Sequence, residues 1–215
     1  PAAAAAQAPT PGPGIGIGIG PATKKKVWCY DFDGVIHTLM HSDYKITNLS
    51  QHPDHDYLKN YFTKHPLFLF RYLFGQTIHD IKSSKDNKEK IEVHIVSANS
   101  EYLYKDKIKE LFETYLDFKL DGIHMDIGNT VSDNKVLKLK ELDCTKFVDD
   151  SCSHIKSVYD ARSNGGLVSL EELYWTIPTE KKYFKIDLVK GLGICNTSNM
   201  SAWDNTAIIK KIDGI

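Results

Sequence analysis

Short apolar runs alternate with helix-length segments along most of the chain, and this alternation constrains the fold more than any other feature. The segments between the runs have helical periodicity, most clearly at 101–115, 134–142 and 154–162. Strands separated by helices are typical of βαβ units, which build a parallel sheet with helices on both faces. The sequence therefore predicts an α/β protein with a Rossmann-like parallel sheet. The expected strands are 27–30, 91–96, 118–125, 146–148 and 167–170.

Three further segments have a less regular pattern. The stretch 57–81 is rich in Tyr, Phe and Leu and is interrupted by Pro66, so we expect two helical pieces there. The charged stretch 83–90 predicts a turn. The C-terminal part, 183–215, shows no pattern that assigns it a structure or a role.

The first 23 residues differ in composition from the rest. The stretch 1–23 contains only Pro, Ala, Gly, Ile, Gln and Thr, and it includes five of the eight prolines. Such a stretch lacks the side chains that build a core, so we divide the chain into an arm, 1–23, and one domain, 24–215. An uncharged arm of this kind suits a protein partner that binds it, for example inside a virus particle.

Composition excludes several classes of protein. The 27 Lys and Arg residues balance 28 Asp and Glu, and a net charge of -1 argues against bulk electrostatic binding to nucleic acid or membrane. No run of about 18 apolar residues is present, so no membrane span is expected. The four cysteines form no CxxC pair, which predicts neither a zinc finger nor a disulfide scaffold, and favours an intracellular, reducing compartment.

Chemically active side chains follow three of the expected strands. Asp31 and Asp33 come after the first strand, Ser97 after the second, and Asp149 and Asp150 after the fourth. Parallel strands end at one edge of a sheet, so these groups are expected to converge there. Four carboxylates so close repel one another unless a cation offsets them, and oxygen ligands favour Mg²⁺.

These residues resemble the motifs of the haloacid dehalogenase-like (HAD) superfamily. Asp31–Val35, Asp-Phe-Asp-Gly-Val, resembles motif I, Ile95-Val96-Ser97 resembles motif II, and Phe147–Asp150 resembles motif IV. Lys135 is the best match for the motif III lysine, with Lys138 and Lys140 as alternatives. The resemblance spans about 27–170 and implies the HAD type of parallel sheet, with a small cap or none, because little room for an insertion is left between the motifs.

The resemblance also implies roles for individual residues. Asp31 would be a nucleophile that forms an aspartyl-phosphate, and Asp33 would protonate the leaving group and then activate water. Ser97 and Lys135 would bind the phosphoryl oxygens. The remaining implied contacts are Phe32, Asp33, Gly34 and Ala98 around the phosphate, and Asp31, the main-chain oxygen of Asp33, and Asp150 around Mg²⁺, with Asp149 supporting the metal or orienting Lys135.

The expected function is therefore a Mg²⁺-dependent phosphohydrolase that acts on a phosphomonoester. Dehalogenating members of the family lack the second Asp of motif I, so Asp33 favours phosphate chemistry. A small cap would leave the site open, which suits an accessible or macromolecular phosphorylated substrate. The alternative is a HAD-fold structural component of a large assembly, with residual catalysis or none. His37 and His41 are expected at the surface, and 52–56 as a solvated loop.

Overall fold

The computed structural model describes residues 25–37, 40–41, 44–45, 72–99, 101–127, 133–177, 182–191 and 209–211. Several predictions lie outside these residues: the arm at 1–23, the aromatic stretch before residue 72, the solvated loop at 52–56, and most of the segment that would form a cap. The inferences that depend on residues outside the described ranges stay predictions.

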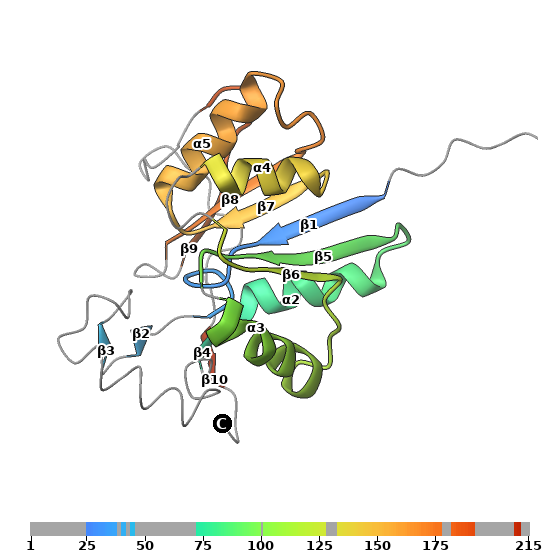
Figure 1. Cartoon of the computed structure of the whole chain (residues 1–215), viewed down its shortest axis with the longest axis vertical. Helices are drawn as coiled ribbons and strands as arrows, with labels where there is room; N and C mark the ends of the chain where they lie inside the picture. The colour runs from blue at the N-terminus through green and yellow to red at the C-terminus, as the bar shows by residue number, and fades with distance from the viewer. Residues whose placement is uncertain are drawn as a thin grey trace, which may run out of the picture.

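A six-stranded sheet runs through the centre of the molecule (Figure 1). Its spatial order is β6-β5-β1-β7-β8-β9, and every neighbouring pair is parallel except β8 and β9. The first strand, β1, lies in the interior of the sheet and is buried at Cys29 and Tyr30, as its apolar sequence predicts. The strands are β1 (Lys26–Tyr30), β5 (Ile91–Val96), β6 (Gly122–His124), β7 (Lys146–Asp149), β8 (Glu172–Ile177) and β9 (Lys182–Lys185).

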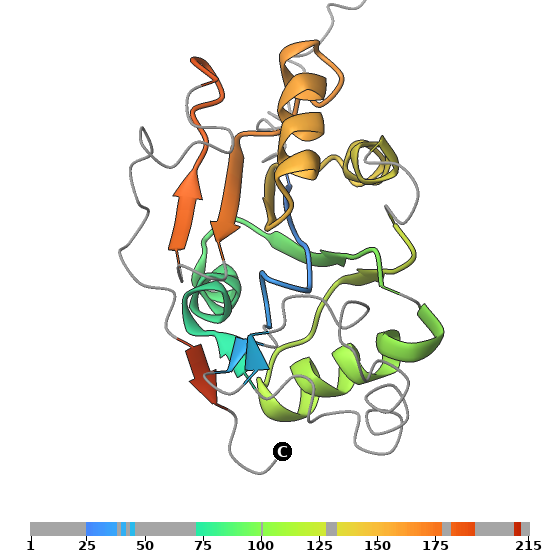
Figure 2. The ribbon, with the colours of Figure 1, turned by 90° about the vertical axis from the view of Figure 1, so that its left-hand side faces the viewer.

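Helices cover both faces of this sheet, as Figures 1 and 2 show. One face carries α2 (Gly75–Ser83) and α3 (Glu101–Glu110), and the other carries α4 (Asp133–Glu141) and α5 (Cys152–Ser163). Two clusters of buried apolar residues result, one on each face of the sheet. A 3-10 turn, Ser84–Asp86, follows α2, and a π-helical turn, Leu111–Tyr115, extends α3. The prediction of an α/β protein with a Rossmann-like sheet is confirmed.

The segment before α2 is a strand, whereas the sequence predicts a helix there. Tyr72–Phe74 forms β4 and pairs antiparallel with β10 (Ile209–Lys211). Leu73 also bridges to His37, and the Phe74 amide donates to the Ile36 carbonyl at 2.9 Å. These partners come from distant parts of the chain, so local periodicity does not reveal them. A short hairpin of β2 (Met40–His41) and β3 (Tyr44–Lys45) precedes β4.

The predicted strand at 167–170 is also wrong. Leu167 and Leu170 are buried, but the Leu170 amide donates to the Leu167 carbonyl at 3.1 Å, which makes the segment a turn. The strand begins two residues later, where the Glu172 amide donates to the Thr145 carbonyl at 3.0 Å. The antiparallel edge strand β9 falls in the part of the sequence that had no assignment.

The cysteines differ from expectation in one respect. Cys29 and Cys144 are free and buried, but Cys152, the first residue of α5, is disulfide-bonded. Cys195 lies outside the described residues. The sequence predicts no disulfide scaffold and assigns Cys152 no partner, and the expected intracellular, reducing compartment stays a prediction. None of the helices that the structure describes is long and apolar enough to cross a membrane.

Candidate active site

The loop after β1 lies at the carboxyl ends of the parallel strands, the edge that faces the viewer in Figure 2. Asp31 begins it, and its amide donates to the Val148 carbonyl of the neighbouring strand at 2.9 Å. Gly34 has a φ of +70°, and a Cβ at this position would lie 2.2 Å from Asp150 Oδ2. Only glycine fits here, because a side chain would be strained and would also overlap the second acidic loop.

Side chains from three elements tether the carbonyls of this loop. Thr77 of α2 donates to the Val35 carbonyl at 2.7 Å, and Thr176 of β8 donates to the Gly34 carbonyl at 2.8 Å. The Tyr183 hydroxyl, on β9, also donates to the Val35 carbonyl, at 3.4 Å. These hydrogen bonds satisfy buried carbonyls and hold the loop in one conformation.

Lys135 lies between two aspartates at the centre of the site. Its Nζ is 3.0 Å from Asp31 Oδ2 and 2.7 Å from Asp149 Oδ2, and neither Lys135 nor Asp149 is exposed to solvent. The first turn of α4 supplies the lysine, and the ends of β1 and β7 supply the aspartates. Lys138 instead pairs with Glu141, and Lys140 is exposed. Of the three candidate lysines, the structure therefore brings Lys135 to the acidic cluster.

The electrostatics of this trio are coupled. Burial raises the pKa of Asp31 to about 6, while Lys135 opposes the rise and the charges of Asp149 and Asp33 add to it. Burial alone would lower the pKa of Lys135, but Asp149 and Asp31 raise it above its ordinary value. Lys135 is therefore a permanent cation beside Asp31 and keeps part of the carboxylate ionised near neutral pH.

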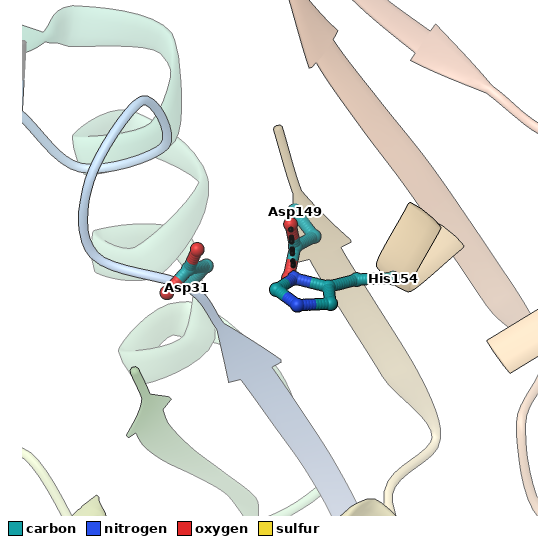
Figure 3. A group of neighbouring side chains, drawn as sticks. All are labelled: Asp31, Asp149 and His154. Carbon is teal, nitrogen blue, oxygen red and sulfur yellow. Dashed lines mark hydrogen bonds and ion pairs between the residues drawn. The ribbon is translucent and has the colours of Figure 1, made fainter. Parts of the chain in front are cut away.

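His154, in the first turn of α5, lies beside Asp149 (Figure 3). Its Nδ1 is 3.2 Å and 3.3 Å from the two carboxylate oxygens. Burial alone would raise the pKa of Asp149, but Lys135 and then His154 lower it below its usual range. Asp31, Asp149 and His154 form a group whose ligand atoms are close enough to hold a metal ion. Lys135 offsets one of the two carboxylate charges in this group, so a further cation would still be favoured there.

No described cation forms an ion pair with the Asp150 carboxylate, although the charge of Lys135 lowers its pKa in part. Its main-chain oxygen accepts from Trp175 Nε1 at 2.9 Å, whereas no described residue donates a hydrogen bond to its carboxylate. Burial, then the charges of Asp31 and Asp149, raise the pKa of Asp150 to about 8. A carboxylate with so high a pKa, packed against Gly34 and close to Asp31, is one that a divalent cation would strongly favour.

Asp33 is more open than the other acidic residues, and both of its oxygens have donors. His37 Nε2 contacts Oδ1, and Asn99 Nδ2 donates to Oδ2 at 2.6 Å. The side chain of Asp33 is 48% exposed, and that of His37 only 4%. Partial loss of hydration alone would raise the pKa of Asp33, but His37 and then Asn99 lower it below its usual value.

The groups expected to bind phosphate lie at the same edge but are partly engaged. Ser97 is buried, and its Oγ accepts from the Asn99 amide at 3.2 Å. The Phe32 amide donates to Asp31 Oδ1 at 2.8 Å, and the Gly34 amide donates to the His37 carbonyl at 2.9 Å. Ala98 is half-buried beside Ser97.

Three contacts of the site were not predicted. The sequence predicts His37 at the surface, but it is buried against Asp33. The sequence motifs assign no role to His154 or Asn99, which contact Asp149 and Asp33. The spacing of His37, four residues after Asp33, is the one local signal that points to this contact. His154 is recognisable only because α5 begins directly after the acidic pair.

The donor set suits a hard divalent cation. Two carboxylates, those of Asp31 and Asp149, contact one buried ammonium group, and the raised pKa values of Asp31 and Asp150 show that negative charge at this edge is only partly offset. Carboxylate and main-chain oxygens are ligands that Mg²⁺ prefers. The residues present at this edge of the sheet therefore fit a bound metal ion.

The mostly parallel sheet between two helical layers makes this an α/β protein with a Rossmann-like fold, and the acidic residues lie at the carboxyl ends of its central strands. No family model matches the chain, and no curated protein matches it. Two solved structures of the HAD domain of the effector protein Lem4 from Legionella pneumophila, one an inactive mutant, are similar. Each has 18% identity, a TM-score of 0.45 and covers 72% of this chain, with 86% of the mutant and 87% of the other covered.

Proposed function

We propose that the protein is a Mg²⁺-dependent phosphohydrolase that cleaves phosphomonoesters through an aspartyl-phosphate on Asp31. One observation carries the proposal: the buried Lys135 bridges Asp31 and Asp149 while Asp33, a second carboxylate on the same loop, stays half exposed. A turn with only a structural role needs no buried ion pair at its centre. Burying three charged groups carries a large desolvation free energy, and such clusters are typical of functional sites.

The residues of the chain divide the chemistry between them. An oxygen of Asp31 attacks phosphorus, the bond from phosphorus to the leaving oxygen breaks, and Asp33 supplies the proton that this oxygen needs. Water then attacks the aspartyl-phosphate, Asp33 takes its proton, and inorganic phosphate leaves with the Asp31 carboxylate restored. Lys135 and the Ser97 hydroxyl stabilise the charge that develops on the phosphoryl oxygens.

Mg²⁺ would be held by Asp31, Asp150 and the main-chain oxygen of Asp33, and when bound it would neutralise charge on the phosphoryl group and the nucleophile. Asp149, which already contacts Lys135 and His154, would keep the lysine directed at Asp31. The raised pKa values of Asp31 and Asp150 support this division, because both carboxylates gain most from a nearby cation.

We further propose that the substrate presents its phosphate from an accessible position, as on a macromolecule. The exposure of Asp33 supports this proposal, because the leaving group must reach that carboxylate from solvent.

The test is turnover of p-nitrophenyl phosphate by the full chain with and without Mg²⁺. Asp31→Asn should lower kcat by about a thousand-fold or more, because an amide cannot act as the nucleophile. Chelation of divalent cations should abolish turnover, and added Mg²⁺ should restore it. Mass spectrometry of an acid-quenched reaction should find the phosphate on the peptide that contains Asp31.

Asp160→Asn is the matched control, because Asp160 is exposed on α5 and is not part of the acidic cluster. It should leave turnover unchanged, and both variants should unfold at the temperature of the unmodified protein within a few degrees. Turnover that survives Asp31→Asn in a folded protein would contradict the proposed function.

A further inference from the structure

We propose that His37 and Asn99 are positioning residues that together hold the Asp33 carboxylate in place for proton transfer. This inference rests on the proposed function, in which Asp33 protonates the leaving group and later activates water. It goes further by assigning a task to two residues that the motifs do not include. Both residues contact Asp33 directly, and each takes a different oxygen of its carboxylate.

His37 is held rigidly behind Asp33. Its ring packs against the ring of Phe32, with centroids 4.7 Å apart, and its side chain is almost fully buried. Its main chain accepts from the Gly34 amide at 2.9 Å and bridges to Leu73 of β4. The imidazole therefore cannot swing away, and its Nε2 stays directed at Asp33 Oδ1.

Asn99 approaches the same carboxylate from the loop after β5. Its side-chain amide donates to Asp33 Oδ2 at 2.6 Å, and its carbonyl accepts from the Asp126 amide at 2.8 Å. Its own amide donates to Ser97 Oγ at 3.2 Å. Asn99 thus connects the proposed acid and base to the hydroxyl that we expect to bind phosphate.

A half-exposed aspartate needs such support. An acid or base must lie within hydrogen-bond reach of the atom that it protonates, and a free carboxylate at the surface rotates among several positions. Each carboxylate oxygen has two acceptor sites, so one donor per oxygen fixes the group and leaves a site for the substrate.

The experiment compares two substrates that differ in how much they need an acid. An alkyl phosphate such as glycerol 2-phosphate has a poor leaving group that must be protonated, whereas p-nitrophenyl phosphate has a good leaving group that needs little help. His37→Leu should lower kcat/KM for the alkyl substrate by about ten-fold or more, and for the aryl substrate by about three-fold or less. His37→Gln should recover most of the loss, because its amide nitrogen reaches Asp33 in place of Nε2.

Asn99→Ala provides a second arm and should show the same preference between substrates. If His37→Leu does not fold, Asn99→Ala alone tests the positioning role. His79→Leu is the matched control, since His79 is exposed on α2 and should leave both substrates unaffected. Circular dichroism and thermal unfolding check that each variant is folded.

Equal loss on both substrates, or no recovery by His37→Gln, would overturn the positioning role while the proposed function stands. If the unmodified protein and Asp31→Asn turn over neither substrate, the proposed function fails first, and this inference fails with it. A selective loss on the alkyl substrate in both His37→Leu and Asn99→Ala supports the inference.

Discussion

Gly34 is the residue at which backbone conformation and the site depend on each other most directly. Its φ of +70° disfavours any side chain, and Asp150 occupies the space that a Cβ would need. Gly165, after α5, has a similar φ of +76°, but no atom lies within 4 Å of its Cβ position. Substitutions at the two glycines can therefore distinguish the effect of backbone strain from the effect of steric overlap with Asp150.

Gly165→Ala should cost only the strain of a left-handed residue, about 1–2 kcal/mol in the free energy of unfolding, and should leave turnover unchanged. Gly34→Ala should cost more than this and should also abolish phosphatase turnover, because the Asp31 loop and the Asp150 carboxylate must move apart. Urea denaturation and p-nitrophenyl phosphate turnover measure the two effects. Equal stability loss in the two variants, with turnover retained in Gly34→Ala, would contradict the role given to Gly34.

At the scale of elements, a buried ion pair joins α2 to the strands of the sheet. Lys146, the first residue of β7, lies 2.5 Å from Asp80 Oδ2 of α2, and the Tyr30 hydroxyl of β1 donates to the same oxygen at 2.6 Å. The ammonium group also lies 4.2 Å from the centre of the Trp28 ring. Both charged side chains are almost fully buried, so neither can exchange its partner for water.

Removing one member of this pair should be strongly destabilising. Asp80→Asn or Lys146→Met should each lower the free energy of unfolding by about 3 kcal/mol, because a buried charge loses its counter-charge. The double variant should lose less than the sum of the two, which a double-mutant cycle by urea denaturation measures. Lys105→Met, which breaks an exposed pair with Glu101 on α3, should change stability by about 0.5 kcal/mol or less. Additive losses at Asp80 and Lys146 would show that the pair is not coupled.

At the scale of the whole molecule, the acidic site makes stability depend on pH. The pKa of Asp150 rises from 3.8 to about 8 on folding, and that of Asp31 from 3.8 to about 6. Between about pH 4 and pH 8 the folded protein binds more protons at these two groups than the unfolded chain does. The stability that this protonation provides is therefore complete below about pH 4 and is lost as the pH rises through the folded-state pKa values. Metal-free protein should therefore weaken between about pH 4 and pH 8.

Asp150→Asn removes the part of this loss that comes from Asp150, because an amide carries no charge at any of these pH values. In the presence of a chelator, the variant should be more stable than the unmodified protein by on the order of 2 kcal/mol at about pH 8, and by much less at about pH 5. Added Mg²⁺ at about pH 8 should reverse the order by stabilising only the protein with Asp150. Urea denaturation at the two pH values measures this. A difference that does not change with pH would contradict the uncompensated charge of Asp150.

The sequence alone predicts most of the elements around the site. Apolar runs of three to six residues and helical periodicity are local patterns, and they correctly place β1, β5, β7, α3, α4 and α5. The positions of Asp31, Ser97 and Asp149 at strand ends follow from the same patterns, because a side chain just beyond a buried parallel strand must lie at its carboxyl edge. Their catalytic roles stay predictions.

Other features depend on contacts between distant segments. β4 is a strand only because β10, more than 130 residues later, pairs with it. The sequence predicts His37 at the surface, but the folded loop buries it against Asp33. The sequence predicts Lys146 in the strand 146–148, but only the folded structure pairs it with Asp80 of α2. Hydrophobic periodicity and position at the end of a strand depend on neighbouring residues, so both can be recognised from the sequence alone. Burial and charge pairing arise only when segments far apart in sequence displace water from one another, and only the tertiary structure decides them.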